Sequence, residues 1–368
     1  MIIKRFKAEG FRNIDSCDIS FSSGVNLLHG NNAQGKTNAV EGIYLFSRGK
    51  SFRARDDSEL VKFGSDGFRI FIEYESCGQS ETLEYALFGK ERQRKKNGYK
   101  LKKVGEMIGS FRSVLFYPDD LKLVKGGPEE RRSFLNVAIS QCYPSYIRYY
   151  SDYKKALENR NCLLKLSAKG FYVDESELDS WSASMAEYAS YIYLMREEYI
   201  EALSRYATGI MSDISESKEN LTLEYESDIE TGLRDRNVIA EKYREVLSKN
   251  LSREMAAGVS LYGPHRDDIK ILINSKDARS FASQGQQRSV VLSLKLSEGE
   301  VVRELFGEYP VFLFDDVLSE LDERRRGYVL SGTRDKQVII TSCEPEELAG
   351  YVDCEIDVSG GCYVSSHR

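Results

Sequence analysis

Two hydrophobic patterns alternate along this chain of 368 residues. Over the first hundred residues, apolar and polar side chains mostly alternate at the two-residue period of a β-strand. Asn97-Gly98 predicts a hairpin turn, because Asn-Gly tolerates the positive φ angles of a type I′ turn. We therefore expect a β-rich lobe at the start of the chain. The strands are predicted at residues 2–8, 17–21, 25–29, 68–74 and 81–88, with one helix at 38–46.

The middle of the chain has the longer period of α-helices, and the last hundred residues return to helices alternating with strands. Helical material between two α/β segments favours a discontinuous α/β domain, residues 1–118 plus 259–368, with an inserted helical lobe at 119–258. No heptad run is long enough for an extended coiled coil. Helices are predicted near 128–141, 144–167, 177–208, 236–251, 286–306 and 322–331, and late strands at 311–314 and 338–342.

Composition excludes several classes of protein. No run of 18 or more apolar residues is present, so no membrane span is predicted, and the first residues do not resemble a secretory signal. The seven cysteines are scattered without a C-x-x-C pair, and only three histidines occur. A disulfide framework and a zinc site are therefore not expected, and a reducing cytoplasm is the simplest compartment.

A phosphate-binding loop occupies residues 30–37. The segment Gly30-Asn31-Asn32-Ala33-Gln34-Gly35-Lys36-Thr37 matches the pattern G-x-x-x-x-G-K-[ST] in full. Its glycines allow a tight turn whose N–H groups point at phosphate oxygens, and the following helix adds its dipole. We expect the Lys36 ammonium to reach the β- and γ-phosphates of ATP, and the Thr37 hydroxyl to ligate Mg²⁺.

A second acidic centre follows the apolar segment 311–314. Asp315 and Asp316 end this predicted strand, where Asp315 would hold Mg²⁺ and Asp316 would polarise the attacking water. An apolar run that ends in Asp is common, so the interpretation depends on the phosphate loop.

The segment Ser283-Gln284-Gly285-Gln286-Gln287-Arg288 precedes an apolar helix. Its position in the chain is that of the signature loop of ABC-type ATPases, in which Ser283 and Gly285 would contact ATP bound to a second subunit, in trans. The alternative is an ordinary capped helix that begins in a polar loop. Thr341-Ser342 stands where ABC-type ATPases have a switch histidine, so hydroxyls would sense the γ-phosphate.

Taken together, these motifs resemble the bacterial RecF recombination-repair ATPases, relatives of the SMC and Rad50 proteins, over essentially the whole chain. Asn136 departs from the family, which often has Asp there, and no convincing Q-loop glutamine is present. Asp316 stands where many ABC-type ATPases have Glu, which suits slow hydrolysis. The supporting segments are Phe11-Arg12-Asn13, Ser51-Phe52-Arg53, residues 56–64, Tyr117-Pro118-Asp119-Asp120-Leu121, residues 124–128, Arg131-Arg132-Ser133-Phe134-Leu135, residues 262–268, 283–288 and 313–322.

The resemblance implies an α/β fold: a Rad50/SMC-like ABC-type ATPase head with a mixed β lobe, a RecA-like core and the inserted helical lobe. It implies a protein that binds ATP and Mg²⁺, dimerises with ATP on gapped DNA or single-strand/double-strand junctions, and helps to load recombinase. Weak, DNA-dependent ATP hydrolysis would act as a switch. RecR-type and RecO-type mediator proteins would be partners, no membrane would be involved, and the protein would be cytoplasmic and associated with the nucleoid.

DNA contact is expected at residues 90–103, which hold eight basic side chains and one acid. On a hairpin they would project as a basic finger that binds phosphates. The alternative is a charged hairpin that protects a sheet edge. The net charge of −6 hides this segment, because residues 174–254 have a balance of −10 and the rest of the chain +4. The candidate DNA-binding residues are Lys95, Lys96, Lys100, Lys102 and Lys103.

Three further groups have two interpretations each. Arg12 and Asn13 either flank the nucleotide or form a salt bridge at a strand end. Arg131 and Arg132 either touch DNA or pair with acids in the helical lobe. For residues 265–268 (His-Arg-Asp-Asp), a polar network linking the lobes near the nucleotide is favoured over a metal or acid–base cluster.

Two other functions compete with the RecF-type interpretation. The first is a P-loop ATPase of another ABC- or SMC-related system, transport- or kinase-like, that does not act on DNA gaps. It would use the same Lys36 and Asp315 chemistry without ATP-dependent DNA binding. The second is an SMC-like tether, which is disfavoured because it requires long coiled-coil arms.

Overall fold

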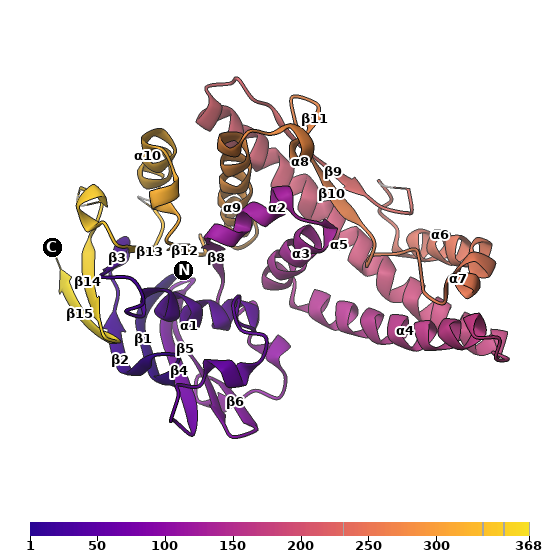
Figure 1. The fold of residues 1–368 in the computed structure, drawn as a ribbon, viewed down its shortest axis with the longest axis horizontal. Helices are drawn as coiled ribbons and strands as arrows, with labels where there is room; N and C mark the ends of the chain where they lie inside the picture. Colours follow the sequence, from indigo (N-terminus) through magenta and orange to yellow (C-terminus); the bar gives the residue numbers. More distant parts are fainter. Residues whose placement is uncertain (231, 333–334, 349, 368) are drawn as a thin grey trace. The chain divides into compact units, whose positions relative to one another are not determined.

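The computed structural model describes residues 1–230, 232–332, 335–348 and 350–367, and these divide into two compact units. Unit 1 comprises residues 1–121, 209–218 and 284–368, and unit 2 comprises residues 122–208 and 219–283. The predicted mixed α/β architecture is confirmed (Figure 1). Unit 1 contains one antiparallel sheet and one mainly parallel sheet, each of six strands. Residues 259–283, which we had assigned to the α/β domain, lie in unit 2 because strand β10 pairs there with β9.

The antiparallel sheet of unit 1 has the strand order β2-β1-β4-β5-β6-β7. Along its strands, buried apolar residues alternate with more exposed polar ones, as the two-residue pattern predicts. Ile70 and Ile72 on the buried face have no exposed surface. Asn97 and Gly98 have φ angles of 50° and 81°, so the predicted hairpin turn is confirmed. The strands are β1 (Ile2–Phe11), β2 (Ile14–Ser20), β4 (Gly67–Ser76), β5 (Gln79–Phe88), β6 (Glu91–Lys96) and β7 (Tyr99–Lys100).

The second sheet of unit 1 has the order β15-β14-β3-β13-β12-β8, and all its pairs are parallel except β14 with β15. Its central strands β12 and β13 are buried along almost their whole length and apolar up to their carboxyl ends, because both faces of a parallel sheet are covered. The carboxyl ends of β3, β13 and β12 lie side by side at one edge. The strands are β3 (Val25–His29), β8 (Ser113–Phe116), β12 (Val311–Asp315), β13 (Val338–Ser342), β14 (Cys354–Ser359) and β15 (Cys362–His367).

Helix α1 (Lys36–Arg48) packs against both sheets of unit 1. Gly42 is required in it, because a Cβ there would lie 2.7 Å from the ring of Phe6. Helix α9 (Gln284–Phe306) packs against β8 and the 3-10 helix η3, and α10 (Glu323–Ser331) follows β12. The 3-10 helices are η1 (Asp57–Leu60), η2 (Val104–Glu106), η3 (Pro118–Leu121), η4 (Leu318–Glu320) and η5 (Pro345–Leu348).

Unit 2 is mainly helical, with the long helices α4 and α5 running side by side (Figure 1). It also contains a small antiparallel sheet, β11-β10-β9, which the sequence analysis missed. Its elements are α2 (Lys122–Lys125), α3 (Pro128–Cys142), α4 (Pro144–Ala168), most of α5 (Glu175–Ser215), β9 (Leu221–Glu226), α6 (Arg236–Lys249), α7 (Leu251–Ala257), β10 (Asp268–Ile273), β11 (Lys276–Asp277) and α8 (Ala278–Phe281).

A fully buried ion pair joins α4 to α7. Arg160 Nη2 lies 2.6 Å from Glu254 Oε2, and both side chains have no exposed surface. The same guanidinium donates to the hydroxyls of Ser182 and Ser260, at 2.9 and 2.7 Å. The charge of Arg160 is therefore balanced and three of its N–H groups are hydrogen-bonded, which is the condition for burying a guanidinium.

Residues 265–268 form a polar network whose partners all belong to unit 2. His265 Nδ1 lies 2.6 Å from the hydroxyl of Tyr153, and burial lowers the pKa of His265 to about 4. Asp267 binds Arg196 at 3.2 Å and accepts a short hydrogen bond from Tyr225. Residues 265–268 do contact the predicted helical lobe, but they belong to the same unit as their partners and do not join it to the α/β unit.

Arg131 and Arg132 pair with acidic positions inside the same unit. Arg131 makes a bidentate ion pair with Asp268, with two bonds of 2.7 Å, and is buried. Arg132 donates to the main-chain carbonyl of Asp267 at 2.8 Å. Of the two interpretations for these arginines, the structural one fits their surroundings.

Candidate functional site

The phosphate loop connects the end of β3 to the first residue of α1. Gly30 has a φ angle of 144°, and a Cβ there would lie 2.2 Å from the carbonyl oxygen of Val358. Gly35 has a φ angle of 118° and forms the N-cap of α1. Only glycine adopts these angles without strain, so both pattern glycines are needed for the conformation of the loop.

The Lys36 ammonium points back into the phosphate loop. It donates to the main-chain oxygens of Gly30 at 2.7 Å and Asn31 at 2.9 Å, and its side chain is buried. Asn32 and Ala33, between these residues and Gly35, are exposed, and Gln34 is partly buried. A positive charge inside a loop of main-chain N–H groups at a helix N-terminus suits a polyphosphate.

Thr37 and Asp315 lie together, although they are 278 residues apart in the sequence. The Thr37 hydroxyl donates a hydrogen bond of 2.8 Å to Asp315 Oδ1, and the Thr341 hydroxyl donates to the same oxygen at 2.9 Å. Burial raises the pKa of Asp315, and both hydroxyls oppose that rise. A hydroxyl and a carboxylate at this separation suit Mg²⁺, which is bound by few protein oxygens together with phosphates and water.

Asp316 has a φ angle of 53°, which is unusual for a residue other than glycine. Its main-chain N–H donates to the Thr341 hydroxyl at 2.9 Å, and the same hydroxyl lies 3.4 Å from Asp316 Oδ1. Thr341 thus contacts both carboxylates. A non-glycine residue in the left-handed region is often found at a functional site, which suits the role we assign to Asp316.

Arg12 and Asn13 have different surroundings. Arg12 makes a bidentate ion pair with buried Glu41 of α1, with bonds of 2.7 and 2.9 Å. This is the salt-bridge interpretation of Arg12. Asn13 contacts the phosphate loop instead, because its amide donates to the Ala33 carbonyl at 3.4 Å and its oxygen accepts from Asn38 at 2.7 Å.

The β14–β15 hairpin contacts and supports the phosphate loop. The sequence analysis did not predict this contact. The main-chain N–H of Gly360 donates to Gln34 Oε1 at 2.6 Å, and that of Gly361 donates to the Gln34 carbonyl at 3.1 Å. The Tyr363 hydroxyl donates to the Gly35 carbonyl at 2.9 Å. The Gly360-Gly361 pair between two alternating segments was the available signal for this hairpin.

Cys343 was also missed as a neighbour of the phosphate loop. It follows β13, and its Sγ lies 3.3 Å from Lys36 Nζ and 2.9 Å from Asn32 Oδ1. The side chain therefore contacts the loop one residue beyond the Thr341-Ser342 pair that the motif comparison selected. No sequence pattern distinguishes this cysteine from the other six.

The candidate signature loop leads into α9. Ser283 is exposed and precedes the first residue of the helix, and Gly285 lies in its first turn. A Cβ at Gly285 would lie 3.4 Å from Arg325 Nη2, and Arg325 Nε donates to the Ser289 hydroxyl at 2.8 Å. Arg325 of α10 therefore packs against the start of α9, on the side where Gly285 lacks a side chain.

The basic hairpin does not project as a finger, and that expectation is wrong. Strand β6 pairs with β5 from Glu91 to Lys96, and Asn97 at the turn bonds Thr82 of β5 in both directions, at 2.9 and 2.7 Å. The hairpin is therefore the edge of the antiparallel sheet. In this edge the candidate lysines separate into two sets.

Two of the five candidate lysines are paired with acids of β5. Lys95 lies 3.0 Å from Glu84, and Lys96 lies 2.9 Å from Glu81. Lys100, Lys102 and Lys103 are exposed, and none of their ammonium groups has an acidic partner within 4.0 Å in the part of the chain that the structure describes. The unpaired charge lies on β7 and the segment after it.

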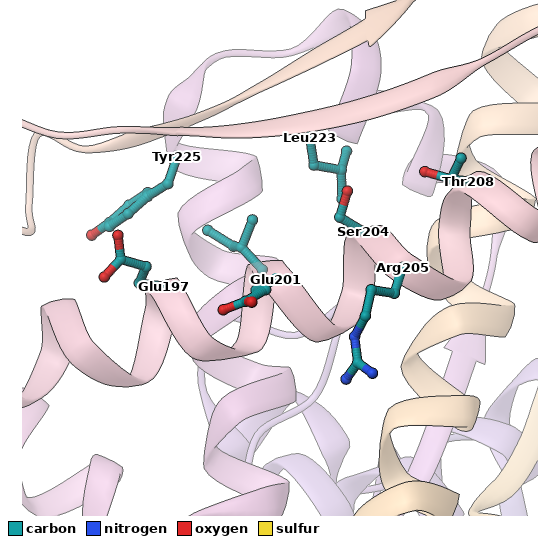
Figure 2. Close-up of a pocket in the computed structure, with 8 residues that line it drawn as sticks. Glu197, Glu201, Ser204, Arg205, Thr208, Leu223 and Tyr225 are labelled. Carbon is teal, nitrogen blue, oxygen red and sulfur yellow. The ribbon is translucent and has the colours of Figure 1, made fainter. Parts of the chain in front are cut away.

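A cavity of about 620 Å³ lies in unit 2 between α5 and β9 (Figure 2). None of the predicted site residues lines it. The lining residues are Glu197, Ile200, Glu201, Ser204, Arg205, Thr208, Leu223 and Tyr225.

Within the described residues, no group of three or more His, Cys, Asp or Glu side chains is placed to hold a metal ion, and no helix is long and apolar enough to cross a membrane.

Comparison with protein families gives one match along almost the whole chain. Residues 2–356 match the family described as RecF/RecN/SMC N terminal domain. The DNA replication and repair protein RecF of Clostridioides difficile (strain 630) is 38% identical over 345 residues, covering 94% of this chain and 92% of the relative. The protein of the same name from Clostridium novyi (strain NT) is 39% identical over 357 residues, covering 96% of both chains.

Solved structures agree with this match. The recombination mediator protein RecF-ATPrS in the RecFOR pathway superposes with a TM-score of 0.91 at 37% identity, covering 99% of this chain and 97% of that chain. The structure of RecF-ATP in the same pathway gives a TM-score of 0.90 at 36% identity, with 100% and 97% covered.

Proposed function

The chain belongs to the RecF family, and from this premise we propose that it is an ATP-dependent DNA-binding protein of recombinational repair and replication-fork maintenance. The observation that supports ATP as the ligand is the hydrogen bond between Thr37 and Asp315 beside the buried ammonium of Lys36. These groups belong to a complete phosphate-loop motif and the carboxylate that such loops require. The structurally similar RecF proteins were solved with ATP or ATPrS.

Each residue of the site has a role in this proposal. The main-chain N–H groups of residues 30–35 and the Lys36 ammonium bind the phosphates, and Asn13 holds the loop through Ala33 and Asn38. Thr37 and Asp315 would hold Mg²⁺, which supplies charge neutralisation at the phosphates. Asp316 orients the attacking water, and as the shorter carboxylate it suits slow hydrolysis that serves as a switch.

Dimerisation with ATP is the second part of the proposal. Ser283 and Gly285 at the start of α9 would contact ATP held by a second copy of the chain, so that each site is completed in trans. The dimer would bind gapped DNA or single-strand/double-strand junctions, help to load recombinase, and work with RecR-type and RecO-type mediators. DNA as the substrate would place it in the cytoplasm, associated with the nucleoid.

One experiment tests the proposal as a whole. Oligomeric mass and affinity for a gapped duplex are measured with ATP, with ADP and without nucleotide, for the wild type and Lys36→Met. We expect dimerisation and tighter DNA binding only for the wild type with ATP. A wild-type protein that stays monomeric, or binds DNA equally in all three conditions, would refute the proposed mechanism.

A further inference from the structure

The basic residues at the edge of the antiparallel sheet fall into two groups, those with a partner in the fold and those without an acidic partner among the described residues. In the first group, all on β6, Lys95 and Lys96 bind Glu84 and Glu81, Arg92 binds Asp57 at 2.7 Å, and Arg94 lies over the ring of Tyr85 at 4.6 Å. These four cations hold β6 to the rest of unit 1. Arg92, Lys95 and Lys96 are paired with acids and offer little net charge to a ligand, whereas Arg94 keeps its charge and is held against an aromatic ring.

The lysines without an acidic partner lie close in sequence to one exposed aromatic residue. Tyr99, the first residue of β7, is 79% exposed, and Lys100, Lys102 and Lys103 follow within four residues. A further lysine is brought to this region, because Gly49 packs against Val104, and a Cβ at Gly49 would lie 2.5 Å from Val104 Cγ2. The next residue is exposed Lys50.

The position of Tyr99 is held by its neighbours in the sheet. Strand β7 is the last in the order, Tyr99 faces Lys96 in the register, and the turn before it is bonded to Thr82. The Leu101 N–H donates to the Arg94 carbonyl at 2.8 Å, so the chain after β7 is also tied to β6. The Tyr99 ring is therefore exposed, while the backbone before and after it is hydrogen-bonded to neighbouring strands. Because so little of the ring is buried, it contributes little to folding.

An exposed aromatic ring among unpaired lysines has the chemistry of a single-strand contact. Bases stack on aromatic faces regardless of sequence, and lysines beside the ring neutralise the phosphates. The bases of an intact duplex are already stacked and paired, so a ring on this edge gains a partner only where bases are unpaired.

We propose that Tyr99 stacks on an unpaired base while Lys100, Lys102 and Lys103 contact its flanking phosphates. This inference rests on the proposed function, and it names the DNA feature that the sheet edge contacts. It predicts that the edge selects single-stranded nucleotides, such as those in a gap, over duplex. Lys95 and Lys96, which are paired with acids, have no role in this contact.

The test compares Tyr99→Ala, Tyr99→Phe and a matched control, Tyr172→Ala. Tyr172 is 91% exposed and lies in unit 2. Fluorescence anisotropy measures the affinity of each variant for labelled oligo(dT) and for a blunt duplex of equal length, with and without ATP. We expect Tyr99→Ala to bind oligo(dT) about tenfold more weakly, as for the loss of one base stack, and to bind the duplex as the wild type does. Tyr99→Phe and Tyr172→Ala should match the wild type.

The outcomes separate this inference from the function on which it rests. Wild-type affinity of Tyr99→Ala for oligo(dT), or an equal loss on oligo(dT) and duplex, would overturn the stacking contact and leave the ATP-dependent function standing. If the wild-type protein binds duplex with ATP but does not bind oligo(dT), the stacking contact is likewise overturned and the ATP-dependent function still stands. A wild type that shows no ATP dependence with either DNA refutes the proposed function itself.

Discussion

The hydroxyl of Thr37 donates a hydrogen bond of 2.8 Å to the carboxylate of Asp315. This bond joins the first turn of α1 to the end of β12, with the Thr341 hydroxyl of β13 bonded to the same oxygen. Two motifs from opposite ends of the sequence therefore meet at one oxygen atom. The relationship depends on the strand order β3-β13-β12, which aligns the three carboxyl ends.

Replacing Asp315 with Asn should remove the Mg²⁺-dependent part of nucleotide binding. The amide has nearly the same shape but no charge, so we expect at least a tenfold loss of ATP affinity with Mg²⁺, or about 1.4 kcal/mol. Isothermal titration calorimetry with and without Mg²⁺ measures this loss. Lys36→Met serves as the comparison, because it should weaken binding in both conditions. Equal affinity of Asp315→Asn and the wild type with Mg²⁺ would contradict the assigned role.

Asp316→Asn should separate ATP hydrolysis from ATP binding. Asn tolerates the left-handed conformation that Asp316 adopts at a φ angle of 53°, so the backbone should not change. We expect hydrolysis to slow by about a hundredfold with ATP affinity unchanged, because the amide cannot act as a base. Single-turnover hydrolysis and nucleotide titration measure the two effects. An unchanged rate would assign the water-polarising role to another residue.

The unpaired lysines should contribute to the salt dependence of oligo(dT) binding. Replacing Lys100, Lys102 and Lys103 with Gln should reduce the slope of log K against log salt by about 2, since each phosphate contact on a single strand contributes about 0.7. The matched variant, Lys95→Gln with Lys96→Gln, removes cations that are paired with Glu84 and Glu81. It should leave the slope nearly unchanged. The reverse result would mean that these ion pairs open when DNA binds.

Arg160→Met should destabilise unit 2 strongly. The substitution leaves Glu254 buried without its partner, and breaking such a pair typically costs about 3–5 kcal/mol. Urea unfolding followed by circular dichroism measures the loss. Lys155→Met is the control, because its pair with Asp152 is exposed on the same helix and should contribute less than about 1 kcal/mol. Similar losses for both variants would show that Glu254 finds another partner.

Glu298 should make stability fall as the pH rises from about 4.5 to about 7. Burial raises the pKa of Glu298 to about 7; Lys295 opposes that rise, and Asp120 adds to it. The unfolded chain releases this proton near pH 4.5, whereas the folded chain retains it until about pH 7. The unfolded state therefore binds fewer protons in this window, and stability decreases by at most about 3 kcal/mol.

Comparison with Glu298→Gln isolates this group, because Asp120, whose pKa burial also raises, stays in place. Urea unfolding across the window measures both proteins. The difference in unfolding free energy between Glu298→Gln and the wild type should grow from pH 4.5 to 7 and stay constant above it. Parallel curves would show that Glu298 ionises normally in the folded chain.

Local patterns predicted what depends on neighbouring residues. The phosphate loop, the Asn97-Gly98 turn and most helices follow from short spacings, which the structure confirms. The pairing of Lys95 with Glu84 depends on the register between β5 and β6, so the charge count alone overestimated the free cations of the hairpin. A count of charges does not show which of them are neutralised.

Long-range pairing limited the rest of the prediction. Strands β9 and β10 are separated by the whole of α6 and α7, so their pairing does not follow from neighbouring residues, although Leu221–Glu226 alternates apolar and polar side chains as a strand does. Their pairing brings residues 268–273 into unit 2 and moves the boundary between the units. The support of Gln34 by Gly360 likewise depends on contact across 326 residues.

The position of β3 has a consequence for how the protein is synthesised. This strand leads directly into the phosphate loop, yet its two neighbours in the sheet are β13 and β14, made more than three hundred residues later. Most of unit 2 is contiguous and can fold while the ribosome is still translating. The nucleotide site cannot form until residues 338–359 have emerged. A nascent chain that lacks residues 338–359 should therefore bind no ATP, so nucleotide binding would begin only after the last strands of the sheet are made.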